Sequence, residues 1–96
     1  MFIVSLEYVV APEAVEPHRM AHMAWVRAGF EQGVFIASGR KEPRTGGIIL
    51  ARISSRKRLQ AILEEDPFIV AGVARYELVE FMPTTVGTGF EALKGL

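Results

Sequence analysis

Apolar and polar positions alternate along residues 2–10, a pattern typical of a β-strand with two unequal faces. The next apolar positions recur at helical spacing, so we predict a helix that begins somewhere in residues 13–18. Its start is limited by Pro17, which is tolerated only in a first turn, and its end at about Glu31 is set by Gly33. The chain is therefore predicted to open with one strand and one long helix.

Two further apolar runs, residues 34–38 and 47–53, flank a polar segment with Gly and Pro and predict a hairpin with a long loop. A second helix is predicted from an N-cap at Ser54 or Ser55 to the Asp-Pro pair at residues 66–67, followed by a connector. Alternation over residues 73–82 predicts a fourth strand. The order βαββαβ indicates a ferredoxin-like α+β fold, with a four-stranded antiparallel sheet and both helices on one face.

No element remains to cover the other face of the predicted sheet. In a chain with 50% hydrophobic residues, a bare sheet face favours pairing with a second copy, so we expect a homodimer. We assign residues 1–83 to the domain and residues 84–96 to a C-terminal tail that is flexible or packed on the partner subunit.

Composition narrows the functional classes. The chain has 96 residues, enough for one domain, and its 11 basic and 11 acidic side chains leave no net charge to attract nucleic acid or an anionic membrane. It has no cysteine, which excludes disulfides and thiolate chemistry and fits a reducing compartment. No apolar run approaches the roughly 20 residues needed to cross a bilayer, and the N-terminal segment lacks the features of a signal peptide. We therefore expect a soluble cytoplasmic protein.

The two histidines of the chain, His18 and His22, both lie on the first predicted helix. At about 100° per residue, His22 shares one sector with Val15, Val26 and Phe30, so it is predicted to point toward the core. A buried imidazole needs a hydrogen-bond partner, and histidine can exchange a proton near neutral pH. His22 is therefore either a structural hydrogen-bonding residue or a general acid/base.

Three acids, Glu64, Glu65 and Asp66, are predicted to stand together at the C-terminus of the second helix. The helix dipole disfavours negative charge there by about 0.3–1 kcal/mol each. Asp66 either makes a simple Asp-Pro turn or approaches His22, where its carboxylate would orient the imidazole and raise its basicity.

Seven of the eleven basic side chains lie within residues 40–58, and three of them, Arg40, Lys41 and Arg44, fall in the predicted hairpin loop. This cluster is either a solvated surface or a site for the carboxylate or phosphate of a small ligand; no Gly-rich phosphate loop accompanies it. The adjacent Ser38 and Gly39 form a turn that could present a hydroxyl or a backbone N–H to the same ligand.

His18 and His22 are four residues apart, a spacing that allows two imidazoles to share one metal ion. A third ligand would have to come from a distant carboxylate, and no glutamate stands between them as in zinc-protease helices. We therefore expect no metal and keep His18 as a candidate ligand-binding residue.

Several short motifs, taken in order, resemble those of YciI-like (YCII-related) domain proteins. They are H-x-x-W-V-R at residues 22–27, E-x-G-V-F-I-A-S-G at 31–39, R-T-G-G-I-I-L-A at 44–51, E-D-P-F-I-V-A-G at 65–72 and Y-E-L-V-E-F at 76–81. Each motif alone is weak, but the ordered set covers nearly the whole domain. It departs from many relatives by Ser-Gly-Arg where they have Gly-Pro, and by the additional histidine His18.

The resemblance implies a ferredoxin-like fold that dimerises as a dimeric α+β barrel, similar to muconolactone isomerases. It also implies a His-Asp pair in a small pocket, carried here by His22 and Asp66, with Ser38 and Gly39 lining that pocket. The family includes a dehydrochlorinase of a chlorinated hydroxyquinol, although most members have no assigned reaction.

From the residues and the resemblance together, the leading hypothesis is a small homodimeric lyase or isomerase that uses no cofactor. His22 would act as general acid/base, oriented by Asp66, on a small carbonyl-bearing or aromatic substrate whose anionic group Arg40 and Arg44 would steer. The alternatives are a non-catalytic ligand-binding or interaction module, in which the pair only fixes the fold, and a structural dimer without a ligand.

Overall fold

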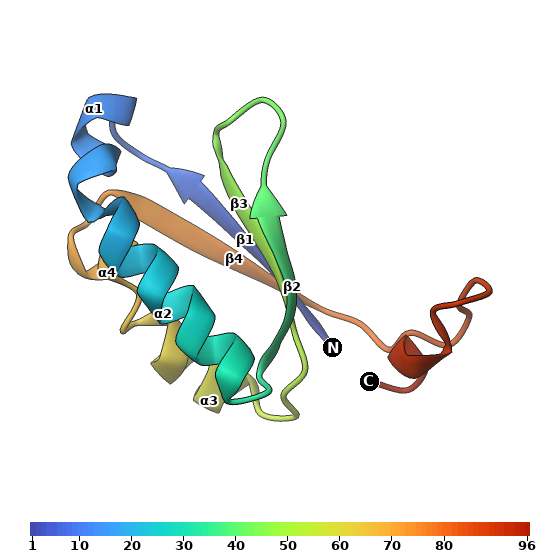
Figure 1. The fold of residues 1–96 in the computed structure, drawn as a ribbon. Helices are drawn as coiled ribbons and strands as arrows, with labels where there is room; N and C mark the ends of the chain where they lie inside the picture. The colour runs from blue at the N-terminus through green and yellow to red at the C-terminus, as the bar shows by residue number, and fades with distance from the viewer.

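The computed structural model describes residues 1–96, and its main elements follow the predicted order (Figure 1). The elements are β1 (Phe2–Tyr8), α1 (Pro12–Val15), the 3-10 turn η1 (Glu16–His18), α2 (Arg19–Glu31), β2 (Phe35–Arg40), β3 (Gly46–Ala51), α3 (Arg56–Leu63), α4 (Pro67–Val70), β4 (Ala74–Glu80) and the 3-10 turn η2 (Glu91–Leu93).

The four strands form one antiparallel sheet in the order β2-β3-β1-β4. Helices α2 and α3 cover one face of this sheet, and the opposite face carries no element (Figure 1). This two-layer arrangement confirms the predicted ferredoxin-like α+β fold. The two central strands are β1, which pairs with β3 and β4, and β3, which pairs with β1 and β2.

The core lies between the helices and the sheet. On β1 the buried positions alternate, and Phe2, Val4 and Leu6 all have less than 3% of their surface exposed. They pack with Val26 of α2 and with Leu59 and Leu63 of α3 in one cluster. The core therefore combines buried residues that recur at every second position of the strand with residues that recur about every 3.6 positions on the helices.

Helix α2 ends as predicted at Glu31. Gly33 follows with a φ of 74°, a left-handed conformation that glycine adopts without steric cost, and its N–H donates to the carbonyl of Phe30. Further back, Gly29 lies directly on the Phe35 ring, so that a side chain at Gly29 would overlap the ring. The helix therefore docks close to β2, while Phe30, predicted to face the core, stays 40% exposed.

Two predictions about the helical segments were wrong. The helix was predicted to begin within residues 13–18, but a separate turn of helix, α1, begins at Pro12, and η1 accommodates Pro17 before α2 begins at Arg19. The segment after Asp66 was predicted to be a connector, but its first four residues form helix α4. Both segments are short turns that begin on or next to a proline, too brief for hydrophobic periodicity to reveal them.

The C-terminal tail leaves the end of β4 and extends away from the two-layer body (Figure 1). Its last residue returns to the N-terminus, where the carbonyl of Leu96 accepts a hydrogen bond from the amino group of Met1. Its backbone turns back on itself, since the N–H of Gly95 donates to the carbonyl of Pro83 over 2.9 Å. Phe90 in the tail is 62% exposed. Packing of the tail on a partner subunit stays a prediction. No helix in the chain is both long and apolar enough to span a membrane.

Candidate active site

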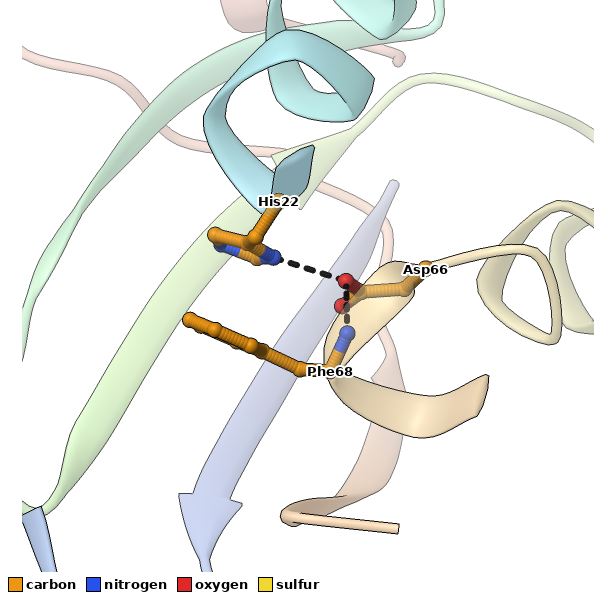
Figure 2. Close-up of polar contacts among 3 residues, drawn as sticks. All are labelled: His22, Asp66 and Phe68. Atoms are coloured by element: carbon orange, nitrogen blue, oxygen red, sulfur yellow. Dashed lines mark hydrogen bonds and ion pairs between the residues drawn. The ribbon is translucent and has the colours of Figure 1, made fainter. Parts of the chain in front are cut away.

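His22 lies in the second turn of α2, on the side that faces the sheet. Its side chain is 12% exposed, and its Nδ1 lies 2.7 Å from Oδ1 of Asp66 (Figure 2). The two residues are 44 positions apart in sequence, so the contact depends on α2 packing beside α4. The structure thus brings together the two residues that the sequence singled out.

Asp66 is held by its own local structure. It is the N-cap of α4, and its Oδ1 accepts the backbone N–H of Phe68 over 3.0 Å (Figure 2). A side-chain oxygen at an N-cap satisfies a helix N–H that would otherwise lack a partner, and negative charge is favoured at a helix N-terminus. The sequence had placed Asp66 at the unfavourable end of α3, but α3 ends at Leu63, so the electrostatic sign is the reverse of the prediction.

The ring of Phe68 lies against one face of the His22 imidazole. The two rings stack with centroids 3.9 Å apart and planes 10° apart (Figure 2). The edge of Tyr8 packs against Phe68 in turn, with centroids 5.7 Å apart and an interplanar angle of 88°. Phe68 therefore contributes twice: its backbone N–H fixes Asp66, and its ring fixes the plane of His22.

The hydrogen bonds define the orientation of the imidazole. A carboxylate only accepts hydrogen bonds, so the contact with Asp66 places a proton on Nδ1 and leaves the lone pair of the neutral ring on Nε2. Nε2 has no protein partner and is not among the fully buried unpaired atoms, so it remains accessible. In Asp66, Oδ1 accepts both bonds while Oδ2 is buried without a partner.

A pocket of about 290 Å³ lies next to His22. It is bounded by α2, by the adjoining ends of β1, β2 and β3 and by the start of α4, and its lining residues are Leu6, Tyr8, Arg19, His22, Met23, Val26, Ser38, Gly39, Arg40, Gly46, Gly47, Ile48, Ile49 and Phe68. Pockets for small organic ligands typically begin at about 300 Å³ and combine apolar walls with a few polar groups. This lining has both, and its volume suits a molecule with a single ring.

Two guanidinium groups contribute the charge of the pocket lining, Arg19 from α2 and Arg40 from β2. Each is paired with a glutamate next to it in sequence: Arg19 Nε lies 2.9 Å from Glu16 Oε2, and Arg40 Nε lies 2.8 Å from Glu42 Oε1. Neither glutamate lines the pocket. The charged side chains in the pocket lining are therefore both arginines, and the glutamates that offset their charge lie outside the lining.

Comparison with known families identifies this arrangement. The model of the YCII-related domain matches residues 1–82. The chain belongs to this family. The match covers the whole two-layer body described above, and it confirms the resemblance carried by the ordered motifs.

A solved structure similar to the YCII-related chain is 5-chloro-2-hydroxyhydroquinone dehydrochlorinase (TftG) from Burkholderia phenoliruptrix AC1100, in complex with 2,5-dihydroxybenzoquinone. The TM-score is 0.68 over 84% of this chain and 93% of that chain, at 15% sequence identity. At this identity the likeness establishes a shared fold. No curated protein sequence matches the chain.

The other predicted site residues of the YCII-related chain divide into two groups. Ser38, Gly39 and Arg40 line the pocket, whereas His18 and Arg44 do not. The three lining residues were predicted to lie in a turn and loop, but they belong to the end of strand β2, which extends to Arg40. His18 caps the N-terminus of α2 through its backbone only, and Arg44 is exposed in the loop between β2 and β3. Within the chain, no three His, Asp or Glu side chains gather in a way that could hold a metal ion.

The sequence had not marked ten of the fourteen pocket residues as site residues, and three of these ten carry charged or aromatic side chains: Arg19, Tyr8 and Phe68. Arg19 precedes His22 by one helical turn, a spacing that was available in the sequence but was not used. Tyr8 lies in the first predicted strand, residues 2–10, where alternation predicts a strand but gives Tyr8 no role in a site. Phe68 stands in the E-D-P-F-I-V-A-G motif at residues 65–72, but the motif gave it no role, because its ring meets His22 only through helix α4, which Asp66 caps.

Proposed function

We propose that the chain is a small homodimeric cytoplasmic enzyme of the lyase or isomerase type, with His22 as general acid/base and Asp66 as the residue that orients it. The observation that carries this proposal is the orientation of one imidazole: Nδ1 is bonded to a buried carboxylate, and the free Nε2 belongs to a side chain that lines the pocket. This is the arrangement in which a histidine exchanges protons with a bound substrate.

The proposed chemistry needs a proton to move and no change in the oxidation state of the protein. Nε2 accepts a proton from an acidic C–H or O–H of a small carbonyl-bearing or hydroxylated aromatic substrate, and the electron pair of that bond moves into the substrate. In a lyase, that pair forms a new π bond as the bond to a leaving group such as chloride breaks, and the chloride departs with the pair of the C–Cl bond, so that the net loss is H⁺ and Cl⁻. In an isomerase, the imidazolium returns the proton to another carbon. In both, the Asp66 carboxylate stabilises the imidazolium that forms.

Two features support a substrate of this class. The shared fold includes a dehydrochlorinase whose structure holds a dihydroxylated quinone, a single-ring compound. In this chain, the hydroxyl-bearing residues Tyr8 and Ser38 line the pocket beside His22, and hydroxyls can hydrogen-bond to the oxygen substituents of such a ring. The elimination and isomerisation steps described above both need these oxygens held in place.

The assignment of His22 can be tested before a substrate is known. We expect ¹⁵N NMR of the neutral ring to show the proton on Nδ1, because Asp66 accepts it. In an Asp66→Asn variant the fold should be kept, since the amide oxygen can still cap α4 and accept from Nδ1, but the preference for this tautomer should weaken because a neutral amide is a weaker acceptor than a carboxylate. A His22 ring in wild-type protein protonated mainly on Nε2 would contradict the proposed role as a base.

Turnover gives the second test, and the chain has a matched control. His22→Gln keeps a polar side chain of similar reach but removes the exchangeable proton, so kcat on chlorinated or enolisable single-ring substrates should fall by about 10²-fold or more. His18→Gln alters a histidine one turn away that does not line the pocket, and it should leave kcat unchanged. Equal losses in the two variants would argue against a specific role for His22.

A second candidate function is a non-catalytic ligand-binding module. It is favoured by one observation: Asp66 already has a structural role, because it caps α4. A pocket that binds single-ring ligands in wild type and His22→Gln alike, without turnover in either, would support this alternative.

The homodimer is proposed from the open face of the sheet. Register pairs Ile3 with Leu50 and with Val79, so these three side chains lie on the face opposite the core residue Val4. Val79 is 54% exposed, and Ile48 extends the same apolar surface. Apolar surface of this kind on a small protein is typically covered by a partner. Light scattering at micromolar concentration should give the mass of a dimer, and Leu50→Lys should give a monomer.

A further inference from the structure

We infer that the pocket takes a monoanionic, single-ring carboxylic acid, whose carboxylate is held between Arg19 and Arg40. The inference names a substrate class for the proposed function and rests on it. Neither the family match nor the dehydrochlorinase name specifies a carboxylate, and the sequence analysis had paired Arg40 with Arg44 instead of Arg19.

The two arginines come from different elements and reach the same pocket. On β2, Arg40 pairs with Gly47 and Ser38 pairs with Ile49, so both side chains lie on the helix-covered face of the sheet. On α2, Arg19 lies one turn before His22. A ligand that contacts both arginines therefore also lies within reach of the proposed base.

The free donors of the two guanidiniums are suited to a carboxylate. Each guanidinium uses only its Nε in the contact with its glutamate, and the Nη groups of both have no protein partner. Arginine carries five N–H donors in a planar fork that matches a carboxylate in a bidentate contact. The side chains are 49% and 64% exposed, so each can turn toward a ligand at the mouth of the pocket.

Charge balance favours a single negative charge. Glu16 and Glu42 already offset the two arginines, so the four side chains sum to zero, and no acid lines the pocket itself. A monoanion can share the arginines with the glutamates, whereas a phosphate dianion would add an excess of negative charge beside them. The volume of about 290 Å³ limits the rest of the ligand to about one ring.

The test compares two probes of nearly equal shape, 4-hydroxybenzoate and its neutral amide, 4-hydroxybenzamide, by NMR titration of the wild-type protein. The acid should bind about tenfold more tightly than the amide, because charge-assisted hydrogen bonds are stronger than neutral ones. Phenyl phosphate serves as the dianionic probe and should bind more weakly than the acid. Equal binding of acid and amide, tighter binding of the phosphate, or no binding of the acid at millimolar concentration would each overturn the inference.

Variants then assign the preference to the two arginines. In Arg19→Met and in Arg40→Met the acid-over-amide ratio should fall, and in the double variant it should approach one. Glu42→Gln removes a competitor for Arg40, so it should raise the affinity for the acid. Arg27→Met is the matched control, since Arg27 is an exposed arginine of α2 outside the pocket lining. A loss of preference in Arg27→Met as large as in Arg40→Met would mean that overall charge, and not the arginine pair, sets the ratio.

The inference and the proposed function fail in different ways. Acid preference that survives in His22→Gln, with no turnover of any acid by wild type, would keep the carboxylate site and reject the enzyme. Turnover of neutral substrates that requires His22 but is insensitive to both arginine substitutions would keep the enzyme and reject the carboxylate site.

Discussion

Two pairs of side chains that can carry opposite charges join segments that are far apart in the sequence. The two pairs differ mainly in burial. His22 and Asp66 meet at 2.7 Å between α2 and α4, with side-chain exposures of 12% and 0%. Arg75 and Glu7 meet at 2.9 Å across β4 and β1 on the open face of the sheet, with exposures of 66% and 50%. The distances are nearly equal, so distance alone does not indicate how much each pair contributes.

Burial and the surrounding hydrogen bonds separate the two pairs. Asp66 has exchanged water for two hydrogen bonds to protein groups, and removing one partner leaves the other group desolvated and unpaired. Glu7 and Arg75 keep most of their water, and salt screens their attraction. The hydrogen bond and charge of Glu7 raise the pKa of Arg75, which leaves it charged throughout the working pH range. The buried pair should therefore be sensitive to substitution, and the exposed pair should tolerate it.

The largest effect is expected from Asp66→Ala. This change removes the cap of α4, the acceptor for His22 and a fully buried side chain, so we expect a loss of about 3 kcal/mol in the free energy of unfolding. Chemical denaturation followed by circular dichroism measures it. Asp66→Asn is the control, because its amide oxygen can still accept from Phe68 and it should retain most of the stability. Equal losses in the two variants would show that charge, and not the hydrogen bonds, holds this corner together.

A much smaller effect is expected from Arg75→Met and Glu7→Gln. Both side chains are exposed, so neither change should alter the free energy of unfolding measurably, alone or together. The two single variants and the double variant form a cycle that isolates the pair interaction. A clear loss that grows with protein dilution would break the comparison, since it would mean that the proposed dimer contact extends from Ile3, Leu50 and Val79 to the Glu7–Arg75 end of the open face and buries this pair as well.

The same contrast explains what the sequence could predict. Strand alternation, the glycine after α2 and the serine before α3 are local signals, and each placed an element close to where the structure has it: Gly33 stops α2, and Ser55 caps α3 by accepting from Arg58. The exposed pair of Glu7 and Arg75 has no such local signal, because it follows only from strand register.

The site was predictable in part, through His22 on the buried side of its helix and Asp66 in the Asp-Pro motif. The sequence could not show why Asp66 is there, because a four-residue helix has too few positions to display a period. Nor could it pair Arg19 with Arg40, since these side chains meet the same pocket only after α2 packs over β2 and β3. What remained unpredicted in both cases is the packing of short elements from distant parts of the chain.

Glu91 in the tail tests the comparison further. Like Asp66, it accepts a hydrogen bond from a backbone N–H through its carboxylate, but its side chain is exposed. Its Oε1 accepts the N–H of Gly89 over 3.1 Å, and hydrogen bonds from the backbone N–H groups of Glu91 itself and of Gly89 lower its pKa. A carboxylate whose pKa is lower in the folded state stabilises that state above its unfolded pKa and loses the contribution as pH falls through the folded value. The Gly89 amide signal in NMR should therefore titrate below the usual glutamate range, while Glu91→Gln removes that titration. Because the side chain is exposed, global stability should not follow this transition; if it did, a hydrogen bond from a backbone N–H to a carboxylate would be enough, without burial, to account for the importance of Asp66.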